Sequence, residues 1–169
     1  GPITIDLFQQ NRPNKDLILV FPILGGKNHI EKHFARHFAI HGFDSAIVHR
    51  DKDFKKPDQF RNIEQNLQRT VIRDRIALDF FEKELGKTEF GTFGLSRGGI
   101  NVVLSAGVDP RLKYNVMVMA GIDLVKIFRH SDQRGLKKYR REVKEYEHIT
   151  DGEFFAYVQD NLKSEPRNV

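Results

Sequence analysis

The chain has no cysteine, no tryptophan and only two methionines among its 169 residues. The absence of cysteine excludes disulfides, cysteine catalysis and zinc sites with cysteine ligands. No apolar run approaches the roughly 18 residues that a membrane-spanning helix needs, so no membrane span is predicted. With 39% hydrophobic and 30% charged residues, the composition indicates a globular domain with a real core.

The N-terminus lacks the basic and then apolar segments that mark a secretory leader. Gly1-Pro2 is typical of the remnant of a removed purification tag, in which case a native leader would be missing from this sequence. The cellular location is therefore open. The lack of cysteine slightly favours the cytoplasm, and export is the alternative if a leader was removed.

The net charge of +5 is concentrated in one basic segment, residues 129–144. This segment has two interpretations: a solvated helix face, or a site for a nucleic acid or lipid. Neither interleaved aromatics nor a nucleic-acid motif is present, so the solvated face is favoured and no nucleic-acid partner is expected. The basic residues are Arg129, Arg134, Lys137, Lys138, Arg140, Arg141 and Lys144.

Apolar patterns alternate between strand and helix along residues 1–122. The continuous run at 17–21 indicates a strand buried on both faces. Such alternation predicts an α/β fold, with a mostly parallel sheet flanked by helices. After residue 122 only helices follow, so we expect a core at 1–122 and a small helical cap or lid at 123–169. The expected strands are 3–8 (an edge), 17–21, 45–48, 90–93 and 114–120, and the expected helices are 28–41, 60–85, 100–106, 123–129, 135–148 and 151–162.

The first expected helix carries two stripes. Asn28 can cap it and Gly42 can end it. Apolar residues recur every four positions and predict a buried face, which consists of Ile30, Phe34 and Phe38 together with Ala35 and Ala39. Histidines also recur at every fourth position, and such pairs can chelate a divalent metal. A polar stripe beside the apolar face is the preferred interpretation, so neither a metal nor a cofactor is expected. The histidines are His29, His33, His37 and His41.

Gly94-Leu95-Ser96-Arg97-Gly98 matches the pattern G-x-S-x-G between an expected strand and an expected helix. In this context the pattern predicts a nucleophile elbow, in which a strained Ser96 projects its hydroxyl from the strand ends. The helix starting at Arg97 would aim its N–H groups at an oxyanion. A second oxyanion N–H is expected from the glycine-containing loop at 22–27, from Leu24 or Gly25. The alternative is an ordinary glycine-rich turn of a nucleotide-binding α/β protein.

These segments resemble bacterial α/β-hydrolases related to dienelactone hydrolase and to the acetyl-esterase and acyl-peptidase group. Residues 20–50 resemble their oxyanion strand, loop, helix and next strand, and residues 93–99 resemble their elbow. The resemblance implies a serine hydrolase that cleaves an ester, thioester or amide of a small acyl substrate through an acyl-enzyme on Ser96. It also implies a histidine base and an orienting acid.

In that family the acid and the histidine follow the serine, on strands beyond the cap. The resemblance therefore predicts a truncated chain, inactive as this fragment, with an incomplete sheet whose exposed edge could associate. Asp123 is an alternative acid, although it can equally cap the following helix. Three histidines of this chain could be considered as the catalytic base, and none is favoured. His130 and His148 follow Ser96 but lie in expected cap segments, and His49 precedes Ser96, so that a loop contact is its preferred role. A pseudoenzyme or non-catalytic binding module is the competing function.

Overall fold

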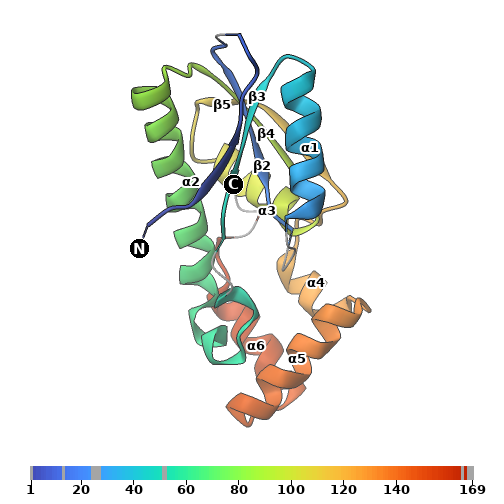
Figure 1. Ribbon diagram of the computed structural model, residues 1–169. Helices are drawn as coiled ribbons and strands as arrows, with labels where there is room; N and C mark the ends of the chain where they lie inside the picture. The colour runs from blue at the N-terminus through green and yellow to red at the C-terminus, as the bar shows by residue number, and fades with distance from the viewer. Residues whose placement is uncertain (1, 13, 24–27, 51–52, 165, 167–169) are drawn as a thin grey trace. The chain divides into compact units, whose positions relative to one another are not determined.

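The computed structural model describes all residues except 1, 13, 24–27, 51–52, 165 and 167–169. The chain forms two compact units, which are described separately here (Figure 1). The first unit contains residues 1–50 and 70–120, and the second contains residues 51–69 and 121–169. Residues 51–69 thus group with the C-terminal helices, although they precede the elbow in the sequence.

A five-stranded sheet forms the centre of the first unit, in the order β1-β3-β2-β4-β5. The edge strand β1 is antiparallel to β3, and the other neighbours run parallel. The expected edge strand and the parallel sheet are therefore confirmed. The strands are β1 (Ile5–Phe8), β2 (Asp16–Phe21), β3 (Asp44–Val48), β4 (Glu89–Leu95) and β5 (Leu112–Val118).

Helices cover both faces of this sheet (Figure 1). On one face, Leu17 and Phe21 of β2 pack in a cluster with Leu78 of α2 (Ile63–Leu85) and Val102 of α3 (Arg97–Ala106). On the other face, Val20 packs in a cluster with Ala35 of α1 (His29–Ile40). The apolar run at 17–21 is continuous because its side chains are buried alternately on the two faces.

Helix α1 corrects the predicted buried stripe. Ile30 is 45% exposed, and Phe34 and Phe38 are only partly buried. Ala35 of the predicted stripe is fully buried, and Phe34 and Phe38 pack against the cluster that contains it. The prediction is wrong at Ile30, and Glu31 is buried although it was not part of the stripe. Asn28 occupies the N-cap position, but its side chain makes no capping hydrogen bond.

The second unit packs helices around aromatic side chains. Phe60 stacks on Phe154 with ring centroids 4.8 Å apart, and Tyr157 donates a hydrogen bond to the Arg61 carbonyl at 2.7 Å. Val143 and Val158 are also fully buried. The described elements of this unit are η1 (Asp53–Lys55), η2 (Pro57–Asn62), the first turns of α2, α4 (Leu124–His130), α5 (Arg134–Glu147) and α6 (Asp151–Asn161). No helix in the described part of the chain is long and apolar enough to cross a membrane.

Candidate active site

Ser96 lies between the end of β4 and the start of α3, and its side chain is exposed. Its backbone has φ 50° and ψ −118°, a conformation that costs an L-residue of order 1–3 kcal/mol. Two hydrogen bonds hold it there: the Ser96 amide donates to the Val118 carbonyl at 2.9 Å, and the Ile100 amide donates to the Ser96 carbonyl at 3.2 Å. The strained strand–turn–helix geometry that the motif predicts is therefore present at Ser96.

Glycines allow this turn because three backbone segments meet there. A Cβ on Gly94 would lie 2.3 Å from the carbonyl of Gly98, and a Cβ on Gly98 would lie 2.2 Å from the carbonyl oxygen of Phe21. A Cβ on Gly99 would lie 2.6 Å from the Cβ of Ala120. Real Cβ atoms essentially never approach other atoms so closely, so a larger residue at any of these positions would force its surroundings to shift.

Of the expected oxyanion donors, only Arg97 lies within the described residues. Arg97 is the first residue of α3, so its N–H belongs to the turn whose amides lack intrahelical acceptors and carry the positive end of the helix dipole. Leu24 and Gly25 lie outside the described residues. The amide of Ile23, just before them, donates to the carboxylate of Glu31 at 2.6 Å. Glu31 was not predicted from the sequence, because its only signal is an acidic residue in the first turn of a helix.

A cluster of buried charges lies around the Arg97 side chain. Asp74 of α2 is fully buried, with the Arg50 guanidinium 2.5 Å away and the Ser105 hydroxyl donating at 3.1 Å. Burial lowers the pKa of Arg97 to about 10, with the Arg50 charge acting in the same direction and Asp74 opposing it. Burial also raises the pKa of Asp74, against the charge of Arg50. The cluster thus holds two guanidinium groups and one carboxylate, and it adds positive potential beside the elbow.

The Ser96 hydroxyl has no hydrogen-bonded base among the residues that the structure describes. His49 directs its Nε2 toward Asp6 at 3.2 Å. Asp123 is the N-cap of α4 and accepts a hydrogen bond from the Lys126 amide at 2.9 Å. His130 is the last residue of α4, and His148 follows α5 with a φ of 54°. The role of Asp123 as an acid stays a prediction.

The four histidines of the α1 region are all exposed. His37 and His41 lie against each other, with ring centroids 4.1 Å apart, and His41 Nδ1 is 2.7 Å from the His37 carbonyl. Within the described ranges, no group of three or more histidine, aspartate or glutamate side chains could hold a metal ion. This stripe is polar surface beside the partly buried Phe34 and Phe38.

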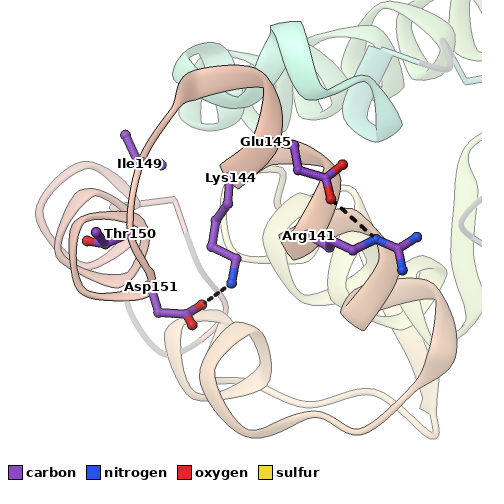
Figure 2. A pocket seen from close by; sticks show the side chains of 6 residues that line it. All are labelled: Arg141, Lys144, Glu145, Ile149, Thr150 and Asp151. Atoms are coloured by element: carbon purple, nitrogen blue, oxygen red, sulfur yellow. Dashed lines mark hydrogen bonds and ion pairs between the residues drawn. The ribbon is translucent and has the colours of Figure 1, made fainter.

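A pocket of about 410 Å³ lies in the second unit, where α5 meets α6 (Figure 2). Its charges are already paired: Lys144 contacts Asp151 at 2.7 Å, and Arg141 lies 3.8 Å from Glu145 (Figure 2). Other cations of the basic segment are also engaged. Lys137 pairs with Asp132, Lys138 pairs with Glu142, Arg140 donates to the carbonyls of Phe128 and Ser131, and Arg129 lies over the Phe155 ring.

Solved structures with a similar arrangement of strands and helices include an α/β-hydrolase and several esterases. An α/β-hydrolase enzyme from sediments of the Mar Chica lagoon, Morocco, matches 99% of this chain and 64% of its own, with a TM-score of 0.50 and 16% identity. The chain has the α/β-hydrolase fold. The acetyl xylan esterase of Paenibacillus sp. R4 matches 86% of this chain and 52% of its own, with a TM-score of 0.53 and 14% identity.

A cold-adapted esterase from an Arctic intertidal metagenomic library has the same fold, matching 90% of this chain and 85% of its own, with a TM-score of 0.55 and 19% identity. The chain spans less than two thirds of the length of the Mar Chica and Paenibacillus enzymes. No family model and no curated protein matches the sequence.

Proposed function

We propose that Ser96 is the nucleophile of a serine hydrolase that cleaves an ester, thioester or amide of a small acyl substrate. The observation that carries this proposal is the conformation of Ser96: an exposed serine with φ 50° and ψ −118° at the first turn of a ten-residue helix. Backbone strain of this kind persists only where the surrounding structure imposes it, and it concentrates at functional sites. An ordinary strand–helix turn would not need it.

The reaction follows from this placement. The Ser96 oxygen attacks the substrate carbonyl while its proton passes to a histidine, and the leaving alcohol, thiol or amine departs with a proton from that histidine. Water then hydrolyses the acyl-enzyme by the same route. The Arg97 amide stabilises the oxyanion of both tetrahedral intermediates, together with an amide from Leu24 or Gly25. Removing one such donor in an enzyme of this kind slows turnover by about 100–1,000-fold.

Two of the three structural neighbours named above are esterases, which supports an acyl substrate. We further propose that residues 123–169 are the helical cap or lid segment of the enzyme. What supports this is that these residues build helices α4 to α6 with buried apolar side chains of their own, such as Phe128 and Phe154.

A second candidate, a non-catalytic binding module with the hydrolase fold, is favoured by one observation. No described side chain is bonded to the Ser96 hydroxyl, and a serine without a base has little nucleophilicity near neutral pH. Under either candidate, residues 1–169 alone are expected to turn over a p-nitrophenyl ester slowly or not at all. Rapid turnover by this chain would contradict that expectation.

A fluorophosphonate probe separates the two candidates, because it reacts covalently with an activated serine. The probe is applied to the complete polypeptide expressed from its gene, so that every residue the reaction needs is present. The hydrolase proposal expects one adduct, located on Ser96 by peptide mass spectrometry and absent in Ser96→Ala. Ser131→Ala is the control serine variant and should keep the adduct, because Ser131 follows α4 and is not part of the charge cluster beside Ser96. A folded protein without an adduct would overturn the proposal and support the binding module.

A further inference from the structure

Two buried side chains of the first unit carry hydrogen-bonding groups that no residue in the described part of the chain satisfies. Arg50 lies just after β3, and its Nη1 contacts the Asp74 carboxylate at 2.5 Å, but its Nε and Nη2 donate no hydrogen bond. Asn101 of α3 is 1% exposed, and neither its amide nitrogen nor its amide oxygen is bonded. Buried polar groups in folded proteins are nearly always bonded, so these donors indicate a bound water or ion.

The fold brings these groups together between α2 and α3. Arg97, Asn101 and Ser105 recur at every fourth position of α3, which places them on one face of the helix. From that face the Ser105 hydroxyl donates to Asp74 of α2 at 3.1 Å, and the charge of Arg97 also acts on Asp74. Asn101 therefore lies between two residues that border the carboxylate which Arg50 contacts. All five residues belong to the first unit.

The surroundings favour a small anion over a neutral molecule. The guanidinium groups of Arg50 and Arg97 accompany one carboxylate, that of Asp74, so the local potential is positive. The Arg50 guanidinium carbon lies 5.2 Å from the centroid of the Phe21 ring, so the ring covers one face of the guanidinium and leaves its N–H edge for a ligand. Asp74 is fully buried and Asn101 nearly so. A ligand that contacts both Arg50 and Asn101 is therefore itself buried, which restricts it to about the size of a chloride ion.

We propose that one chloride-sized anion binds in the first unit between α2 and α3, held by Nε and Nη2 of Arg50 and by the amide nitrogen of Asn101. The anion supplies the acceptor that these N–H groups need. This site is separate from Ser96 and does not depend on the proposed hydrolase function. Because its residues come together only when the chain folds, the anion binds the folded state and stabilises it.

Urea unfolding of the chain in two salts tests the site. Sodium chloride replaces sodium gluconate at constant total salt, so that charge screening stays constant while the small anion varies. The free energy of unfolding should rise with the chloride concentration, in proportion to its logarithm once the site is mostly filled. Equal stability in the two salts at every ratio would overturn the proposal, because bound water would then be the occupant.

Two variants assign the effect to these side chains. Asn101→Leu keeps the side-chain volume but removes the donor, and Arg50→Met removes the guanidinium. Each should raise the dissociation constant for chloride by at least about tenfold, which is the expected loss for one hydrogen bond to a charged group. Arg75→Met is the matched control: Arg75 also lies on α2, next to Asp74, but its side chain is 55% exposed, so the chloride dependence should not change.

Wild-type chloride dependence in either Asn101→Leu or Arg50→Met would overturn the proposal, since the anion would then bind elsewhere. The two variants are independent, so one decides if the other fails to fold. Bromide locates the ion directly, because it replaces chloride and scatters X-rays anomalously. Crystals soaked in sodium bromide should show an anomalous peak within hydrogen-bonding distance of both Arg50 and Asn101. A water molecule without anomalous signal at this position would contradict the assignment.

Discussion

Gly98 lies so close to the backbone of Phe21 that a Cβ at position 98 would fall 2.2 Å from the Phe21 carbonyl oxygen. Gly98→Ala must therefore move α3 or β2, and overpacking of this kind costs about 1–3 kcal/mol or more. We expect urea unfolding to show that loss. Gly135→Ala is the control, because nothing lies within 4 Å of its missing Cβ in α5 and alanine is the better helix former. Equal stability of Gly98→Ala and the wild type would contradict the close approach.

The strain at Ser96 predicts that glycine stabilises this position. Glycine adopts positive φ without steric cost, so Ser96→Gly should raise the free energy of unfolding by about 1 kcal/mol, the strain being partly offset by the greater freedom of glycine in the unfolded chain. Ser96→Ala keeps the strain and loses no capping bond, so its stability should stay within about 0.5 kcal/mol of the wild type. Urea unfolding of the two variants side by side decides, and a less stable Ser96→Gly would argue against strain.

Periodicity and turn chemistry were enough to predict the five strands, the helices α1 to α6 and the strained turn at Ser96. The apolar run at 17–21 has no other simple explanation than a strand buried on both faces, and the glycines around Ser96 indicate close backbone contacts. Helix ends were also predictable, since Gly42 and Gly86 both have positive φ where helices α1 and α2 end. Local sequence patterns therefore predict the local secondary structure of this chain.

Tertiary contacts explain what the sequence did not predict. Glu31 is buried although hydrophobicity counts that residue as solvent-facing, and the Ile23 amide donates to one of its carboxylate oxygens. Residues 51–69 join the C-terminal helices through contacts such as Phe60 with Phe154, which are far apart in the chain. The buried ion pair between Asp44 and Lys87 likewise joins distant segments. No periodicity marks such pairs in advance.

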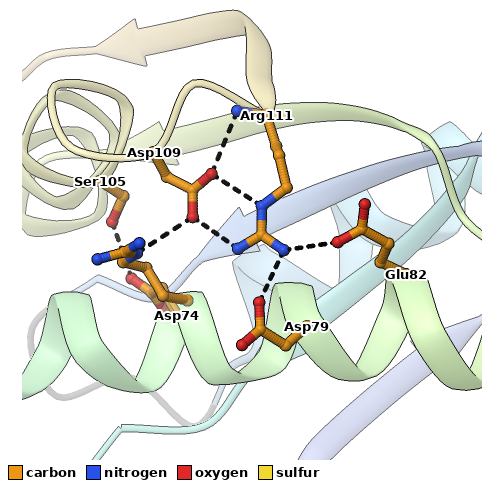
Figure 3. Close-up of polar contacts among 7 residues, drawn as sticks. Asp74, Asp79, Glu82, Ser105, Asp109 and Arg111 are labelled. Carbon is orange, nitrogen blue, oxygen red and sulfur yellow. Dashed lines mark hydrogen bonds and ion pairs between the residues drawn. The ribbon is translucent and has the colours of Figure 1, made fainter.

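Asp109 predicts an acid-dependent contribution to stability. It is 1% exposed, and Arg111 donates to both of its carboxylate oxygens, at 2.9 and 2.7 Å (Figure 3). These hydrogen bonds hold the pKa of Asp109 below the ordinary 3.8, although burial opposes them. A lowered pKa in the folded state means stability that is present above pH 3.8 and lost as the pH falls through the folded-state pKa.

Asp109→Asn should therefore cost about 1–3 kcal/mol near neutral pH, and the difference from the wild type should shrink as the pH falls below 3.8. Urea unfolding across an acidic pH series measures it. Asp132→Asn is the matched control: Asp132 pairs with Lys137 at 2.7 Å, but its side chain is 89% exposed, so solvent screens the pair and little change is expected. A pH-independent loss for Asp109→Asn would show that packing, rather than charge, is responsible.

Thr150 begins α6 with a reciprocal capping box, and its removal should loosen that helix. The Thr150 hydroxyl accepts from the Glu153 amide at 3.3 Å, and the Thr150 amide donates to the Glu153 carboxylate at 2.8 Å. Thr150→Ala should lower the free energy of unfolding by about 1 kcal/mol, because the hydrogen bond from the Glu153 amide to the hydroxyl is lost. Thr150→Ser keeps both hydrogen bonds of the capping box. Amide hydrogen exchange is the sharper measurement, since the loss should speed exchange along α6 and leave the β2 and β4 amides of the first unit unchanged. Equal acceleration in both units would mean that α6 unfolds only together with the sheet.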